Sequence, residues 1–138
     1  PRSEYLGSDG LLAKMRRWSD ERFGFFAAEV DGCFIGWFHL RPSVFDPEIY
    51  ELGYRLARAY WGVGYATEGG RALCLLAFAE LGQDRVDACA LPENLGSIAV
   101  LKKCGMSYIG DGVHPRVPAT VARFLVTRVE FSEGLPLK

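Results

Sequence analysis

The feature that most constrains the fold is a strand, a glycine-rich turn, a helix and a second strand that follow one another across residues 49–91. We interpret "IYELGYRL" as a strand, "ATEGGRALCLLAFAELG" as a helix and "RVDACAL" as a short buried strand. A strand–helix–strand unit normally makes a right-handed crossover between two parallel strands. Ligands of such units bind beyond the carboxyl ends of the strands, beside the helix N-terminus. The sequence therefore predicts an α/β fold with a binding site at the turn.

Four glycines lie at or just after this turn, and they divide into two pairs. Gly62 and Gly64 precede the helix, whose first N–H groups lack helical partners and carry the positive end of the macrodipole. Glycine lets the backbone approach an anion closely, so the spacing favours a phosphate site; a tight turn that needs positive φ is the alternative. Gly69 and Gly70 lie inside the helix, where we expect close packing against the sheet or a ligand. The spacing fits neither a dinucleotide-fold loop nor a P-loop.

A β-hairpin is predicted in "FFAAEVDGCFIGWFHL", because Asp31-Gly32 is a dipeptide that two-residue turns favour. Centring the turn on this dipeptide gives three cross-strand pairs that share one apolar face. They are Val30 with Cys33, Ala28 with Ile35, and Phe26 with Trp37.

The remaining segments extend the alternation of helices and strands. We predict helices over residues 10–18 and 94–104 and strands over residues 106–110 and 119–131. Ser8 or Asp9 can cap the first of these helices, and Asn94 can cap the second. Gly105 is the C-terminal stop of the second helix.

Composition and charge exclude several classes of protein. The 138 residues suit one domain, and a formal net charge of -1 does not favour a nucleic-acid-binding protein. No apolar run approaches a membrane span and no signal peptide opens the chain, so we expect a cytoplasmic protein with no membrane partner. No metal site is expected, because the cysteines lack paired spacing and resemble buried thiols: Cys33, Cys74, Cys89 and Cys104.

Two motifs in order, "LGYRLARAYWGVGYATEG" and "ALPENLGSIAVLKKCGM", resemble the GCN5-related N-acetyltransferase (GNAT) superfamily. The most similar branch includes ribosomal-protein alanine N-acetyltransferases, and residues 24–130 follow the family order. The resemblance implies a mixed central sheet with a splayed parallel strand pair and helices on both faces. It also implies acetyl-CoA as cosubstrate, no metal, and direct transfer of acetyl to a primary amine.

The resemblance also implies a coenzyme site. The amides of Val63, Gly64, Tyr65, Ala66 and Thr67, in the turn shaped by Gly62, would hold the pyrophosphate. The strand ending at Leu56 would pair its backbone with the pantetheine arm. Asn94 would bind pantetheine or cap the helix beside it.

Two residues are candidates for proton transfer. Glu51 lies on the strand before the turn, where the family often carries a base that acts through water; the alternative is a solvated carboxylate. Relatives often have a tyrosine acid at the position of Leu101. Because leucine cannot donate a proton, Ser97 is the candidate hydroxyl, against the alternative of ordinary helix-start chemistry.

We expect residues 1–138 to form one acetyltransferase domain in which the first strand of the family is missing. Its loss would expose the edge of "GFFAAEV", so we expect either a longer polypeptide or a homodimer that covers this edge. The acceptor would be a protein N-terminus or a small amine such as a polyamine or aminoglycoside. The alternative functions are a degenerate acyl-CoA-binding module without activity and a fold in which the glycines serve only as turns.

Overall fold

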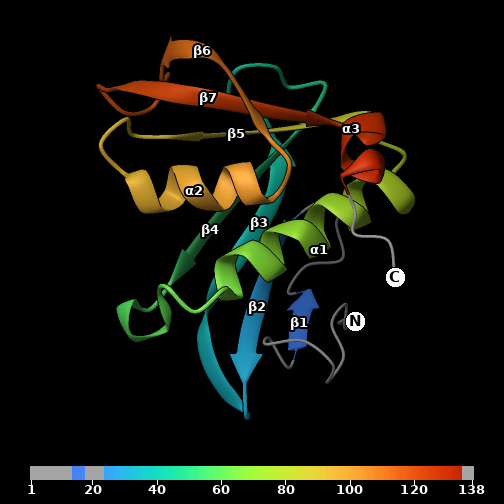
Figure 1. Ribbon diagram of the computed structural model, residues 1–138, viewed down its shortest axis with the longest axis vertical. Coiled ribbons are helices and arrows are strands. Elements are labelled where there is room, and N and C mark those ends of the chain that lie inside the picture. Colours follow the sequence, from blue (N-terminus) through green and yellow to red (C-terminus); the bar gives the residue numbers. More distant parts are fainter. Residues whose placement is uncertain (1–13, 18–23, 135–138) are drawn as a thin grey trace.

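The computed structural model describes residues 14–17 and 24–134, and within them the strands form one seven-stranded sheet of order β1-β2-β3-β4-β5-β7-β6 (Figure 1). The strands are β1 (Lys14–Arg17), β2 (Gly24–Val30), β3 (Cys33–Pro42), β4 (Tyr50–Leu56), β5 (Arg85–Ala90), β6 (Ser107–Val113) and β7 (Thr120–Thr127). The helices are the 3-10 helix η1 (Arg58–Tyr60), α1 (Tyr65–Ala79), α2 (Leu95–Lys103) and α3 (Arg128–Glu133).

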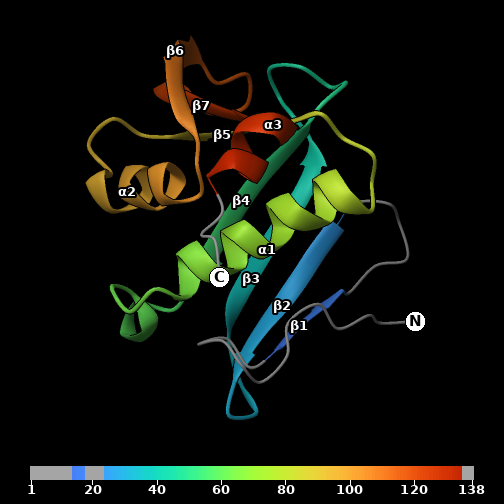
Figure 2. The ribbon, with the colours of Figure 1, turned by 45° about the vertical axis from the view of Figure 1, so that its right-hand side comes forward.

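The predicted crossover unit is present as β4, α1 and β5. The two strands are parallel but pair at only two positions, Tyr50 with Val86 and Glu51 with Asp87. Beyond Glu51 they diverge, and each keeps an antiparallel neighbour, β3 for β4 and β7 for β5 (Figure 2). The splayed parallel pair is therefore confirmed, and it leaves one edge of β4 free to face a cleft.

The hairpin turn is confirmed, but its register is wrong beyond the first pair. Asp31 and Gly32 have φ of 52° and 77°, and Val30 pairs with Cys33 as predicted. A β-bulge then adds Ile35 to β3, so that the observed partners are Ala28 with Gly36 and Phe26 with Phe38. The bulge places the fully buried Phe38, rather than Trp37, on the core face.

The predicted helix over residues 10–18 is wrong where the structure describes it, and its proposed caps Ser8 and Asp9 lie outside the described residues. Lys14–Arg17 form β1, which pairs antiparallel with residues 26–29 of β2. Pairing with an open strand edge satisfies backbone groups, and this tertiary effect overrides the local helical pattern. Because β1 covers residues 26–29, this edge of β2 is not exposed there, and it does not call for a longer polypeptide or a homodimer to cover it.

The last predicted strand ends earlier than expected, because residues 128–131 belong to α3. Thr127 Oγ1 accepts the N–H of Glu130 at 3.1 Å, and Glu130 Oε1 accepts the N–H of Thr127 at 3.0 Å. This reciprocal capping box starts a helix directly after β7. The Thr-x-x-Glu pattern was visible in the sequence and was the signal that the strand interpretation missed.

The described helices pack together on one side of the sheet. Gly70 of α1 approaches Leu52, and Ser97 of α2 contacts Tyr54, which places both helices on the same face of β4. Phe131 of α3 packs on Phe78 of α1 with ring centroids 5.4 Å apart. The expectation of helices on both faces is thus not met within residues 14–17 and 24–134. The core fills the α1 side with Phe26, Ile35, Phe38, Leu40, Leu73 and Cys74.

Candidate active site

A cleft of about 210 Å³ lies at the splay between β4 and β5. Side chains alternate along a strand, so Glu51 and Gly53 face one side of the sheet while Leu52 and Tyr54 face the other. All four residues line the cleft, which therefore passes through the sheet. Its remaining walls are formed by His39, Arg41, Ala66, Gly70, Cys89, Ser97, Val100, Leu101 and His114.

The glycine turn presents unpaired amides beside this cleft. Gly62 and Gly64 have φ of 74° and 106°, and Gly64 is the N-cap of α1. The N–H of Glu68 donates to Gly64 O at 3.0 Å; within the described part of the chain, no group accepts the amides of residues 63–67. Their role in binding a phosphate remains a prediction, but the geometry it requires is present.

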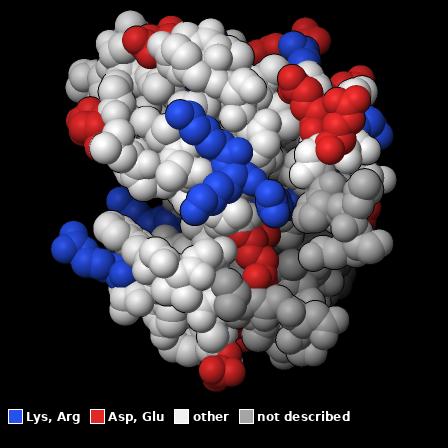
Figure 3. Space-filling view, viewed as in Figure 1, with Lys and Arg blue, Asp and Glu red and all other residues white. Residues whose placement is uncertain are grey.

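Basic side chains lie on the helical face and beside the turn. Figure 3 shows Lys and Arg gathered over the C-terminal half of α2, where Lys102 and Lys103 occupy the last turn. Arg71 of α1 joins them by donating to Lys103 O at 2.9 Å. At the turn, the Arg58 guanidinium lies 5.3 Å from the centre of the Trp61 ring.

Packing against the sheet, one of the two predicted alternatives, explains Gly69 and Gly70. A β-carbon at Gly69 would overlap the ring of Phe38, and one at Gly70 would lie 2.7 Å from Cys104 Sγ. Both glycines are buried. They allow α1 to lie directly against β3 and against the end of α2, which fixes the position of the turn.

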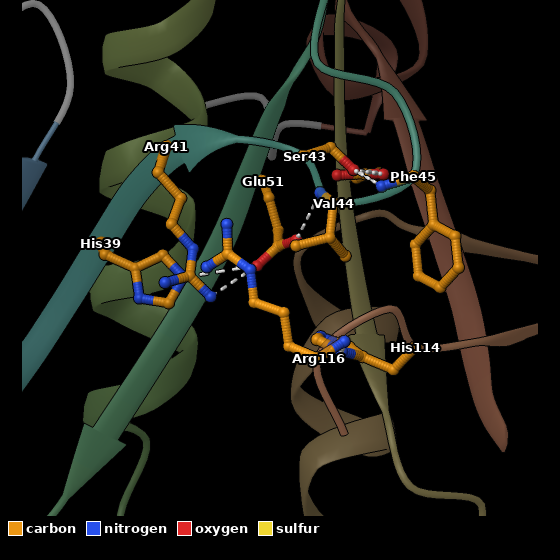
Figure 4. Close-up of polar contacts among 9 residues, drawn as sticks. His39, Arg41, Ser43, Val44, Phe45, Glu51, His114 and Arg116 are labelled. Carbon is orange, nitrogen blue, oxygen red and sulfur yellow. Dashed lines mark hydrogen bonds and ion pairs between the residues drawn. The ribbon is translucent and has the colours of Figure 1, made fainter. Parts of the chain in front are cut away.

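Glu51 is a buried carboxylate held by three partners and is not solvated. It is 6% exposed, and its oxygens lie 3.4 Å from Arg41 Nη2, 3.5 Å from His39 Nε2 and 3.3 Å from the Val44 N–H (Figure 4). Burial alone would raise the pKa of this carboxyl. The contacts with His39, Val44 and Arg41 outweigh burial, and the pKa is lowered. Glu51 is therefore ionised at neutral pH.

Tyr54 and Ser97 form a hydroxyl pair on the opposite side of the cleft, which sequence reasoning did not find. The Tyr54 hydroxyl donates to Ser97 Oγ at 3.3 Å. Burial raises the pKa of Tyr54, so the phenol stays protonated. The only signal in the sequence was the alternation along "YELGYRL", which places Tyr54 on the helical face.

The other predicted residues lie around these two groups. Asn94 caps α2, accepting the Ser97 N–H at 3.0 Å, so the capping alternative is observed. Leu101 is buried in the cleft wall. Leu56 ends β4, and its carbonyl accepts the indole N–H of Trp61 at 2.8 Å. Its part in binding pantetheine remains a prediction.

A second buried carboxyl lies next to Glu51. Asp87 pairs with Glu51 across the parallel strands, is 2% exposed and accepts a 2.6 Å hydrogen bond from the Ser43 hydroxyl. Burial raises its pKa to about 6.

Cys89 follows on the same strand, and burial raises the pKa of its thiol to about 11. Cys33 is exposed, which contradicts the expectation that all four thiols are buried.

The family profile described as "Acetyltransferase (GNAT) domain" matches residues 6–107. This match covers well over half of the chain, and the chain belongs to the GNAT acetyltransferase family.

Curated relatives are similar over a large part of the chain. FsC-acetyl coenzyme A-N(2)-transacetylase of Aspergillus fumigatus is 31% identical over 122 residues, which cover 79% of this chain and 52% of the relative. The probable N-acetyltransferase YjcK of Bacillus subtilis is 44% identical over 94 residues, covering 67% and 51%. The chain thus spans about half the length of these relatives. Neither comparison specifically supports the ribosomal-protein alanine branch.

Solved structures share the fold. Aminoglycoside acetyltransferase AAC(6')-Ib in complex with coenzyme A has a TM-score of 0.72 at 21% identity, covering 83% of this chain and 71% of that one. The spermidine/spermine N-acetyltransferase SpeG of Vibrio cholerae has a TM-score of 0.70 at 18% identity, covering 83% and 72%. Among the described residues, no helix has the length and apolar character needed to cross a membrane.

Proposed function

We propose that this protein transfers the acetyl group of acetyl-CoA to a primary amine by direct attack inside the cleft. One observation supports this most: the cleft passes through the sheet at the splay of β4 and β5. A donor bound on the helical face and an acceptor bound on the opposite face can therefore meet at the gap. Holding two reactants in this way replaces a bimolecular encounter with a positioned reaction.

The coenzyme would bind on the helical face. The amides of residues 63–67, which have no acceptor among the described residues, are suited to the pyrophosphate, and the edge of β4 that diverges from β5 is suited to the amide groups of pantetheine. The thioester would then enter the cleft beside the hydrogen-bonded Tyr54–Ser97 pair. No metal has a part in this scheme.

Glu51 would receive the proton that the amine loses. Its lowered pKa makes it a weak base toward a free ammonium group, which has a pKa of about 10. The nitrogen becomes far more acidic once it has attacked the thioester, so transfer to Glu51 suits that stage, through an intervening water. The acceptor must reach the thioester as the neutral amine, because an ammonium nitrogen has no lone pair with which to attack.

The charges around Glu51 favour an acceptor with few positive charges. Arg41 and His39 contact Glu51, and His114 lines the same cleft. The Arg116 side chain points toward Glu51 in Figure 4. Among the cleft-lining residues that the structure describes, Glu51 is the only carboxylate, and Arg41 already offsets it. A protein N-terminus or a simple amine fits this end better than a polyamine or an aminoglycoside, because additional cations would meet the arginines.

An acceptor screen tests the function. Purified protein is incubated with acetyl-CoA and peptides, amino acids, spermidine or kanamycin, and release of coenzyme A is followed by a thiol reagent. We expect turnover with peptides or monoamines, reduced by roughly 10²-fold in Glu51→Gln. Unchanged rates in that variant would remove Glu51 as the base. Coenzyme binding without turnover of any amine would instead support the degenerate acyl-CoA-binding module.

A further inference from the structure

We propose that Tyr54 is the source of the proton that the departing coenzyme thiolate takes up, and that Ser97 relays it. This inference rests on the proposed acetyl transfer. It assigns a proton donor to a cleft whose lining includes the buried Leu101 and two hydroxyl side chains, those of Tyr54 and Ser97.

The geometry gives the relay a direction. The Tyr54 hydroxyl donates to Ser97 Oγ at 3.3 Å, so the Ser97 hydroxyl hydrogen is free to point elsewhere. Both residues line the cleft, and they come from different elements, β4 and α2. Ser97 is further held by the cap of α2, where its N–H donates to Asn94 Oδ1 at 3.0 Å. The pair is therefore fixed at the cleft wall beside which the proposed function places the thioester.

Acidity explains why the phenol is needed. A serine hydroxyl is far too weak an acid to protonate a thiolate by itself, whereas a phenol, with a pKa of about 10, is close to a thiol at about 8.5. Burial raises the pKa of Tyr54 and keeps its proton in place until negative charge develops on sulfur. Serine thus carries the proton, and tyrosine supplies it.

The steps balance as follows. The C–S bond of the tetrahedral intermediate breaks, and its electron pair goes to sulfur. The Ser97 proton moves to sulfur while the Tyr54 proton moves to Ser97 Oγ, leaving a phenolate. Water reprotonates the phenolate, and this offsets the proton that the amine has lost on the Glu51 side of the sheet.

Other groups lining the cleft are less suited to this step. Glu51 is ionised and lies on the opposite face of β4 from Tyr54. Cys89 keeps its proton, with a pKa of about 11, but an S–H group is a weak hydrogen-bond donor. His39 contacts Glu51 and so belongs to the acceptor side.

The central variant is Tyr54→Phe. It removes only the hydroxyl and keeps the ring that stacks on Phe38, with centroids 5.7 Å apart, so the fold is retained. We expect kcat with acetyl-CoA to fall by roughly 10²-fold. Coenzyme A affinity, measured by calorimetry, should change less than about twofold, because the pair acts on the leaving group. Tyr108→Phe is the matched control, since that exposed tyrosine donates to Asp111 at 2.7 Å and lies outside the cleft lining.

Two further measurements separate a proton donor from a structural residue. With an acetyl thioester of 4-nitrothiophenol, whose thiolate leaves without assistance, the ratio of wild-type to Tyr54→Phe rates should approach one. In the double variant Tyr54→Phe/Ser97→Ala, the loss should not exceed that of the worse single variant, because the two residues act as one unit.

An unchanged kcat in Tyr54→Phe would overturn the assignment while leaving acetyl transfer intact. An equal loss of rate with acetyl-CoA and with the 4-nitrothiophenol thioester would do the same. If the wild-type protein turned over no amine, the proposed function and this inference would both be wrong. The wild-type control thus distinguishes the two failures.

Discussion

His39 on β3 lies directly opposite Gly53 on β4, and its imidazole occupies the volume that a β-carbon at residue 53 would need. The ring also meets Phe25 edge-on, with centroids 5.7 Å apart, and its Nε2 lies 3.5 Å from Glu51 Oε2. Gly53 therefore sets the position of the imidazole, and through it the surroundings of the carboxylate.

Gly53→Ala should impair catalysis from the acceptor side. The new methyl group must displace the His39 ring, and displacements of about 1 Å near a reacting group can cost roughly 10²-fold in rate. We expect kcat/KM for the amine to fall by about tenfold to a hundredfold while coenzyme A affinity holds. In a His39→Ala background the clash disappears, so adding Gly53→Ala should have little further effect on the free energy of unfolding. If the losses of unfolding free energy in the two single variants added up in the double variant, the two residues would be independent.

The two glycine pairs of the turn should respond differently to alanine. Gly69→Ala places a methyl group against the Phe38 ring, and overpacking a core typically costs about 1–3 kcal/mol of unfolding free energy. Gly62→Ala meets no atom within 4 Å, but it strains a φ of 74° and rigidifies the amide turn.

We therefore expect Gly69→Ala to lower stability in urea denaturation. Gly62→Ala should mainly reduce the thermal stabilisation that acetyl-CoA gives, which is about 2.7 kcal/mol at 100 times Kd for the wild type. Equal coenzyme stabilisation in Gly62→Ala and wild type would argue that the turn does not contact the pyrophosphate.

Asp87 should make the protein more stable as the pH falls from 7 to 5. Its pKa is raised from 3.8 to about 6 by burial, so the folded state binds a proton that the unfolded state releases in this window. Stability from this group is present below about pH 4 and is lost as pH rises through 6, which amounts to about 1 kcal/mol between pH 5 and pH 7. Glu51 acts in the opposite sense, because its pKa is lowered, but only below its ordinary value of 4.5.

Urea denaturation at pH 5 and pH 7 measures this difference. Asp87→Asn should remove it, and Asp84→Asn, at an exposed aspartate paired with Arg128, should retain it. An unchanged pH dependence in Asp87→Asn would assign the effect to another group.

The sequence predicted the elements that depend on local residue patterns, and it missed those that depend on tertiary contacts. The crossover unit, the Asn94 cap and the Asp31-Gly32 turn follow from periodicity and turn chemistry, and all three are confirmed. The strand at residues 14–17 and the bulge at Ile35 depend on pairing with a distant partner, which no local pattern encodes. In the site, the position of Glu51 was predictable, but its burial was not.

Arg41 should control the pH at which Glu51 becomes active. Its Nη2 lies 3.4 Å from Glu51 Oε2 and is one of the contacts that lower the pKa of the carboxyl. In Arg41→Gln the positive charge is gone while burial remains, so the pKa of Glu51 should rise. If Glu51 must be ionised for transfer, the acidic limb of the kcat/KM profile should move to higher pH by the same amount.

The matched control is Arg85→Gln, which breaks the 3.8 Å ion pair with Asp46 at a half-exposed site and should leave the limb in place. A profile that is unchanged in Arg41→Gln, measured with the same amine, would mean that the acidic limb reports a group other than Glu51.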